Sequence, residues 1–200
     1  MKVLGVTGGS GCGKTTVCKI LKDNGAEILD ADVIVKKLQR KGTKTFKKIV
    51  AHFGESIVDE LTGELNRKAL AEIVFNDAKE RAVLNGIVHT EVAKVFKKKI
   101  AEFEKAGVKL TVLDVPIPTE EGFYDLVNAV WAVVANDDLR IERIMERSGF
   151  TQDEALARIS AQHSNREYSE IADTVIDNEG SYEELEKLVE FELERLMNDF

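Results

Sequence analysis

Residues 6–16, VTGGSGCGKTT, combine residue types and a spacing that could bind a nucleoside triphosphate. They fit the pattern Gly-x-x-x-x-Gly-Lys-Thr/Ser, with glycine at positions 8 and 13 ahead of Lys14 and Thr15. Backbone N–H groups can wrap a phosphate only where the chain turns tightly and few side chains obstruct it. We therefore predict a phosphate-binding loop, whose nucleotide-binding residues are Gly8, Gly9, Ser10, Gly11, Cys12, Gly13, Lys14, Thr15 and Thr16.

The chemistry of this loop depends on Lys14, Thr15 and the elements on either side. Lys14 is expected to reach the β- and γ-phosphates of the nucleotide, and the Thr15 hydroxyl to ligate Mg²⁺. The alternating run at 2–6 predicts a strand before the loop, and the apolar spacing over 16–24 predicts a helix after it. The positive end of that helix would face the bound anion. The alternative is a glycine-rich turn that binds no ligand.

Two carboxylates stand where strands are expected to end. Asp32 closes the run EILDAD, and a carboxylate there could accept a proton from a substrate hydroxyl or help to hold Mg²⁺. An Asp at this point could also cap a helix that begins at Val33. Asp114 closes the apolar run LTVLD and resembles the second acid that supports the metal in phosphate-loop proteins. Asp32 is thus a candidate catalytic residue and Asp114 a candidate metal ligand.

Five arginines crowd into one short stretch in the second half of the sequence. Three of them, Arg140, Arg143 and Arg147, follow one another at spacings of three and four in a helical pattern, so they share a face and repel each other. A bound anion would relieve that repulsion. The alternative is a solvated helix face, on which Glu142 and Glu146 soften the repulsion.

Composition restricts the function further. The chain has 200 residues, 44% of them hydrophobic, and suits one domain with an insertion or two. Its net charge of −8 argues against nucleic acid or an acidic membrane as the main partner. We expect a cytoplasmic protein, because no apolar run approaches the roughly 20 residues of a membrane span and the start shows no cleavable signal. We expect Cys12 and Cys18 to be reduced and to act as small residues, not as a disulfide or a metal site. No feature of the sequence points to an obligate protein partner.

Strand and helix patterns alternate along the chain, which indicates an α/β fold with a parallel sheet covered on both faces. Five β-rich runs are expected, at 2–6, 26–30, 110–115, 129–135 and 174–177. The segment between the second and third runs is far longer than one crossover requires, so it must hold an inserted helical region. Helical patterns within it cover 33–41, 43–53, 67–75 and 78–105. Capping-box pairs at Thr151–Glu154 and Ser181–Glu184 predict two later helices.

Several short runs, taken in order, resemble the dephospho-CoA kinase family over nearly the whole chain. The runs are GVTGGSGCGKTT with the downstream DAD, FG at 53–54, GELNRKAL at 63–70, VF at 74–75, Asn85 with His89, VP at 115–116, Glu120, RISAQ at 158–162 and ADTVIDNEG at 172–180. No single run would be diagnostic, but their order and spacing together are.

The resemblance implies a fold, an activity and a division of the chain. The fold would be that of phosphate-loop NTPases, a five-stranded parallel sheet flanked by helices, with an inserted helical acceptor domain and a helical lid. The nucleotide-binding core would comprise residues 1–32, 108–136 and 172–200, the acceptor (CoA) region 33–107 and the lid 137–171. The activity would be transfer of the ATP γ-phosphate to the ribose 3′-hydroxyl of dephospho-CoA, giving CoA and ADP.

The resemblance also assigns roles to residues of this sequence. For the nucleotide, it makes Lys14 the phosphate-binding lysine, Thr15 the Mg²⁺ ligand and Asn178 a neighbour of the adenine. For the acceptor, it makes Asp32 the general base on the 3′-hydroxyl and places Arg67 and His89 in the acceptor site. Arg143 and Arg147 would be catalytic residues of the lid. Three positions depart from the family pattern, Thr90, Pro118 and Arg140. We expect the first two to bear on the acceptor pocket and the third to leave the nucleotide site alone. His89 could also be a packing residue.

Other functions remain to be weighed against this interpretation. A kinase for another hydroxyl acceptor, such as a nucleoside or shikimate, would share the loop and an acidic second strand, but would not predict GELNR, RISAQ or ADTVIDN. A GTP-driven switch would need Asn-Lys-x-Asp and an Asp-x-x-Gly after the third strand, and the sequence has neither there. A protein that binds nucleotide without transferring phosphate is the third alternative.

Overall fold

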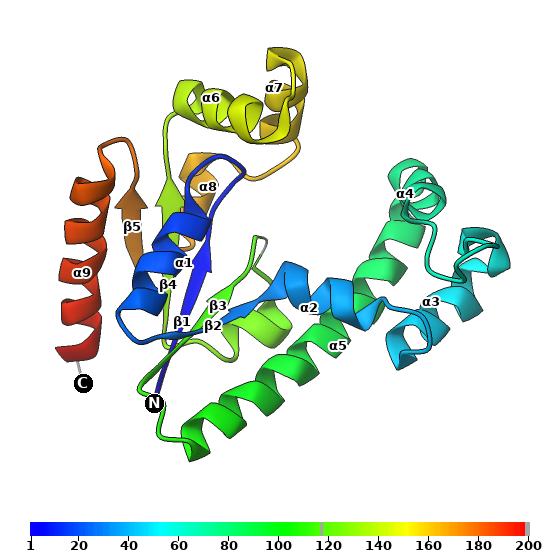
Figure 1. The fold of residues 1–200 in the computed structure, drawn as a ribbon, viewed down its shortest axis with the longest axis horizontal. Coiled ribbons are helices and arrows are strands. Elements are labelled where there is room, and N and C mark those ends of the chain that lie inside the picture. Colours follow the sequence, from blue (N-terminus) through cyan, green and yellow to red (C-terminus); the bar gives the residue numbers. More distant parts are fainter. Residues whose placement is uncertain (117, 199–200) are drawn as a thin grey trace.

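Five parallel strands form the centre of the structure, a computed structural model that describes residues 1–116 and 118–198 (Figure 1). The strands are β1 (Lys2–Thr7), β2 (Glu27–Asp30), β3 (Leu110–Asp114), β4 (Ala129–Val134) and β5 (Thr174–Asp177). Their order in the sheet is β2-β3-β1-β4-β5. The predicted five-stranded parallel sheet is confirmed. Positions 117, 199 and 200 of the expected nucleotide-binding core lie outside the described residues.

Strand β3 lies between β1 and β2, so β1 and β2 are not neighbours in the sheet. The register places Asp114 beside Val6 on one side and beside Asp30 on the other. All three strands therefore end at the same level. The carboxyl ends of β1, β3 and β2 bring the phosphate loop, Asp114 and the DAD run to one edge of the sheet, in that order.

Helices cover both faces of the sheet, as the buried strands require. On one face, α1 (Lys14–Asp23) and α9 (Tyr182–Asn198) pack over Leu4, Val6 and Val112. On the other face, Val3 and Leu113 pack with the inserted helices. Residues of β1 thus alternate between two cores, because successive side chains of a strand point to opposite faces.

The inserted helical region is confirmed between β2 and β3. Its elements are α2 (Ala31–Leu38), α3 (Lys44–Phe53), the short 3-10 turn η1 (Glu55–Ile57), α4 (Arg67–Asn76) and the 28-residue α5 (Ala78–Lys105). Figure 1 shows α3 and α4 far from the sheet, joined to it by α2 and α5. Buried Ile49, Leu70 and Phe96 link these helices to the core under β3.

One expectation about α2 is wrong. The helix begins at Ala31, and its N-cap is Asp30, whose side chain accepts from the Val33 N–H at 2.9 Å. Asp32 lies in the first turn and does not cap the helix. The sequence DAD offers two acids two residues apart, and the one that ends the strand, Asp30, has the extended backbone that an N-cap needs.

Three helices stand between β4 and β5, namely α6 (Asp137–Ser148), α7 (Gln152–Ser160) and α8 (Asn165–Glu170). Figure 1 shows α6 and α7 above the carboxyl ends of the strands. The predicted capping box of Thr151 and Glu154 opens α7. A second capping box, formed by Ser164 and Glu167, opens α8, a helix that was not predicted from the sequence. The π-helical turn η2 (Glu120–Tyr124) was not predicted either. No helix in the described residues combines the length and apolar character of a membrane span.

Candidate active site

A pocket of about 510 Å³ opens at the carboxyl ends of the strands, where open α/β sheets bind ligands. Every predicted phosphate-loop residue except the buried Cys12 lines it. Asp32, Arg143 and Arg147 line it too, so the structure brings these predicted residues together. Three further lining residues were not among the predicted site residues, and they are Pro116, Arg158 and Gln162.

The glycines of the loop are required by the protein as well as by a phosphate. Gly8, Gly11 and Gly13 have φ of 145°, 80° and 92°, a region that side chains disfavour. A Cβ at Gly11 would lie 2.6 Å from the backbone oxygen of Arg140, and one at Gly13 would collide with Asn178. Gly13 is also the N-cap of α1 and offers no side-chain cap. The first N–H groups of α1 are therefore directed at the pocket without a capping side chain.

Lys14 and Asp114 form an ion pair at the base of the pocket. Burial by itself would lower the pKa of Lys14, but the Asp114 carboxylate outweighs that effect and the pKa is raised. Lys14 consequently stays charged at neutral pH. The Lys14 side chain lines the pocket and is 16% exposed, so a nucleotide phosphate could reach it. The Asp114 side chain is 10% exposed and is not among the lining residues.

Asn178 supports the phosphate loop from the interior of the protein, next to two buried cysteines. The buried Asn178 side chain donates its amide N–H to the Cys12 carbonyl at 2.8 Å. Cys12 and Cys18 are both buried and free, as predicted, and burial raises the pKa of each thiol. Both therefore remain protonated and serve as small core residues.

The five arginines do not form one cluster. Arg143 donates to the Asn178 carbonyl at 3.0 Å and to the Gly11 carbonyl at 3.4 Å. Arg147 lines the pocket, and the Arg158 Nε donates to the Ser10 hydroxyl at 3.0 Å. Arg166 is exposed and pairs with Glu170 at 2.7 Å.

Arg140 contradicts two expectations. It is 1% exposed, so it does not share a solvent face with Arg143 and Arg147. It does not leave the nucleotide site alone either, because its Nε donates to the Ser10 carbonyl at 3.0 Å. Its Nη1 donates to Asp137 at 2.9 Å, while its Nη2 has no hydrogen-bond partner among the described residues. The spacing of residues in a helix predicts that they share a face. It does not predict which residue of that face is buried against the rest of the protein.

Ser10 makes three hydrogen bonds that connect the phosphate loop to the segment between β4 and β5. Its N–H donates to the Gln162 side-chain oxygen at 2.7 Å, its carbonyl accepts from Arg140, and its hydroxyl accepts from Arg158. Gln162 and Arg158 belong to the RISAQ run, whose order alone could have drawn attention to them.

A second, smaller pocket of about 140 Å³ adjoins the first and shares Asp32 and Pro116 with it. Its walls are mostly apolar and include Phe96 and Phe123. His89, on α5, lies at its rim, and burial lowers the pKa of the ring, so the imidazole is neutral at pH 7.

Three residues linked to the acceptor site lie elsewhere. Arg67, the first residue of α4, is exposed and lines neither pocket. Thr90 and Pro118 line neither pocket as well. The structure thus brings Asp32 and His89 together around the second pocket, but not Arg67.

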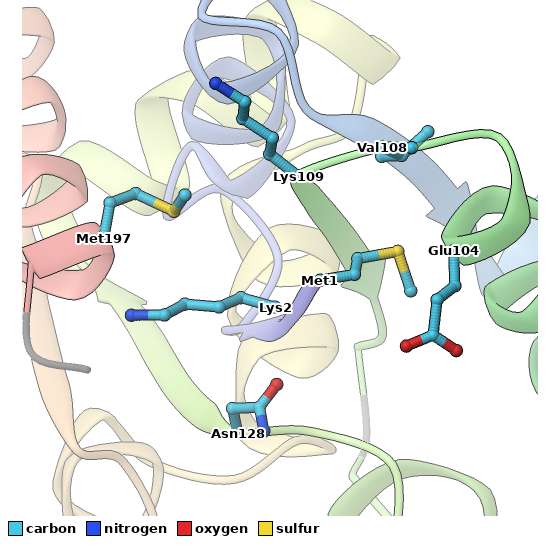
Figure 2. Close-up of a pocket in the computed structure, with 8 residues that line it drawn as sticks. Met1, Lys2, Glu104, Val108, Lys109, Asn128 and Met197 are labelled. Atoms are coloured by element: carbon cyan, nitrogen blue, oxygen red, sulfur yellow. The ribbon is translucent and has the colours of Figure 1, made fainter.

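A hollow of about 620 Å³ lies at the opposite, amino ends of the strands (Figure 2). Met1, Lys2, Glu104 and Met197 surround it, and none of the predicted site residues does. The predicted site residues therefore gather at the opposite end of the sheet, around the first pocket of about 510 Å³.

A parallel sheet of this order, a glycine-rich loop before α1 and an acid at the end of β2 define a phosphate-loop kinase. Residues 2–184 match the family model described as dephospho-CoA kinase. The chain belongs to the dephospho-CoA kinase family and is an ATP-dependent phosphotransferase.

Individual dephospho-CoA kinases align with this chain over nearly the whole length of both proteins. The chain is 42% identical to the dephospho-CoA kinase of Bacillus licheniformis over 184 residues, which cover 92% of this chain and 91% of that protein. It is 40% identical to the dephospho-CoA kinase of Carboxydothermus hydrogenoformans, over 92% of this chain and 88% of the relative. The solved structure of dephospho-CoA kinase from Campylobacter jejuni superposes with a TM-score of 0.71 at 25% identity and covers 100% of this chain and 99% of that one.

Proposed function

We propose that this chain transfers the γ-phosphate of ATP to the ribose 3′-hydroxyl of dephospho-CoA, giving CoA and ADP. The observation that supports this most is the continuity of the two pockets. Asp32 and Pro116 line both, with the phosphate loop on one side and a mostly apolar space on the other. A donor nucleotide in the first pocket and an acceptor in the second would meet at the Asp32 carboxylate.

In the proposed reaction, Asp32 accepts the proton of the 3′-hydroxyl as the oxygen attacks the γ-phosphorus. A new O–P bond forms at the 3′ position while the bond between the γ-phosphorus and the β,γ-bridging oxygen breaks, and ADP leaves with that electron pair. Lys14, Arg143 and Arg147 offset the negative charge of the transferring group. Lys14 would leave Asp114 for the phosphates when the nucleotide binds.

The residues at the base of the pocket fit a Mg²⁺ ion. Mg²⁺ binds through one or two protein oxygens together with substrate phosphates and water, so a dense acidic cluster is unnecessary. Thr15 lines the pocket and Asp114 lies at its base beside Lys14, and both carry suitable oxygen atoms. We propose these two as the residues that hold it. When bound, the ion neutralises charge on the β- and γ-phosphates.

The remaining roles follow the same division of the chain. We propose residues 1–32, 108–136 and 172–200 as the nucleotide-binding core, 33–107 as the acceptor region and 137–171 as the lid. Asn178 would lie beside the adenine, while His89 contacts the acceptor as a neutral ring. Arg67, from α4, would reach the acceptor only if that helix moves towards the pocket.

The decisive experiment measures ADP release with ATP and Mg²⁺ across dephospho-CoA, AMP, uridine and shikimate. We expect the highest kcat/KM with dephospho-CoA, and a product whose new phosphate is located at the 3′ position by phosphorus NMR. A much higher kcat/KM with AMP or uridine would contradict the proposal at the acceptor. Unchanged acceptor after long incubation would favour a nucleotide-binding role without transfer.

A further inference from the structure

Between Val33 and Gly54 the chain carries seven lysines and arginines and no acidic residue, although its net charge is −8. All seven side chains are exposed, along α2, the turn that follows it and α3. We name them the α2–α3 basic stretch, and they are Lys36, Lys37, Arg40, Lys41, Lys44, Lys47 and Lys48. The rest of the chain is correspondingly more acidic than the whole.

Most of these charges have no acidic partner. Lys48 pairs with Glu91 at 2.8 Å, and Lys41 donates to the Thr62 carbonyl at 3.2 Å. The other five members of the α2–α3 basic stretch form no ion pair with any residue that the structure describes. Like charges one helical turn apart repel each other. An anion bound beside them would remove that cost.

One end of the α2–α3 basic stretch lies next to the reacting centre. Asp32 is in the first turn of α2 and lines both pockets, and Val35 lines the second. Lys36 follows Asp32 by four residues, so it lies on the same face about 6 Å further along the helix axis. Helical side chains lean towards the N-terminus, which directs Lys36 back towards Asp32. Arg40 lies two residues beyond the end of α2, and its side chain is exposed.

The described residues around the second pocket supply no positive charge. None of its described lining residues is a lysine or an arginine. The cations of the first pocket, Lys14 and the arginines, surround the place of the donor phosphates. An acceptor that carries its own phosphates next to the reacting hydroxyl must therefore find positive charge outside both pockets. Lys36 is placed to provide it.

We propose that Lys36, supported by Arg40, binds the diphosphate of the acceptor. The inference rests on the proposed function, since dephospho-CoA carries its diphosphate on C5′ of the same ribose whose 3′-hydroxyl would face Asp32. The spacing between that hydroxyl and the diphosphate is comparable to the helical turn between Asp32 and Lys36. A lysine suits this role because its compact ammonium group binds phosphate as a point charge.

A small anion explains the basic stretch better than a nucleic acid does. The net charge of −8 over the whole chain disfavours the approach of a long polyanion. A diphosphate contacts only the end of the α2–α3 basic stretch that adjoins Asp32. The proposal therefore predicts that its two ends differ in function.

The test compares Lys36→Gln with Lys44→Gln, which removes the same charge from the first turn of α3. In the Lys36→Gln variant we expect the KM for dephospho-CoA to rise about tenfold, with kcat and the KM for ATP close to those of the unmodified chain. Lys36→Arg keeps the charge and should restore most of the affinity. Lys44→Gln should leave all three parameters unchanged.

A second acceptor separates diphosphate binding from general attraction. Adenosine keeps the 3′-hydroxyl but lacks the diphosphate, so Lys36→Gln should not change kcat/KM for adenosine. Equal losses in Lys36→Gln and Lys44→Gln, or an unchanged KM for dephospho-CoA in Lys36→Gln, would overturn the inference. Failure of the unmodified chain to phosphorylate dephospho-CoA would instead overturn the proposed function.

Discussion

Asp32 is the residue on which the proposed chemistry depends most. The structure separates it from the capping role, because Asp30 caps α2. Replacing Asp32 with Asn should therefore remove the base without disturbing the helix. We expect Asp32→Asn to lower kcat by at least about two orders of magnitude while the affinity for ATP stays near normal. Single-turnover kinetics and nucleotide titration measure the two quantities separately.

Asp30→Asn is the matched control for this substitution. Asn caps helices about as well as Asp, so α2 should remain intact and activity should stay close to that of the unmodified chain. Full activity in Asp32→Asn would exclude the base role. Loss of Mg²⁺-dependent ATP binding in that variant would assign Asp32 to the metal.

Arg140 is the residue that helical periodicity placed wrongly. Its burial beneath the loop depends on the approach of α6 to Ser10, a contact between residues far apart in the sequence. Periodicity within one helix cannot reveal such a contact. By contrast, the phosphate loop could be predicted from the sequence, apart from the burial of Cys12, because its glycines and Lys14 form a local pattern whose chemistry needs no tertiary partner.

Arg140→Met should weaken both the fold and the loop. The substitution leaves the Ser10 carbonyl without its donor and removes a charged hydrogen bond to Asp137. We expect the free energy of unfolding to fall by about 1.5–3 kcal/mol, and the affinity for ADP to fall with it. Chemical denaturation and calorimetric titration test this. Arg166→Met, which removes an exposed arginine, should change neither quantity.

At the scale of elements, the strands and long helices could be predicted because each has a clear periodicity or an apolar run. The predicted and observed bounds coincide for β5 and α5. Helix α8 has only six residues, too few for a periodic pattern, and its capping pair Ser164–Glu167 was the available indication. The sheet order could not be predicted from the strand sequences, because the residues of a strand do not identify the strand that pairs with it. The buried strands β1, β3 and β4 are all apolar runs of the same kind.

Helix α6 carries Arg143 and Arg147, the two arginines that would act on the transferring phosphate. Arg147 is the cleaner test, because it lines the pocket but makes no hydrogen bond or ion pair with the residues that the structure describes. Arg143 also supports the Gly11 carbonyl. We expect Arg147→Ala to lower kcat by about 10³-fold, with an unchanged melting temperature. A variant with normal turnover would assign Arg147 to a solvated helix face.

For the whole molecule, the first pocket lies where separate parts of the fold meet. The phosphate loop joins the sheet to α1, and Ser10 joins that loop to α6 and α7, whose own small core of Ile144, Ala155 and Ile159 is distinct from the two cores of the sheet. A nucleotide bound there would contact both parts at once, because residues of both line the pocket. Nucleotide binding should thus stabilise the whole chain against unfolding and not the loop alone.

The size of this stabilisation follows from mass action. ADP at 100 times its dissociation constant should add about 2.7 kcal/mol to the free energy of unfolding, which for a chain of this length corresponds to a rise in Tm of roughly 5–10 °C. Lys14→Met should abolish most of the rise, since the lysine contributes to phosphate binding. Lys187→Met, on the exposed side of α9, should keep it. An equal rise in both variants would show that the nucleotide binds away from the phosphate loop.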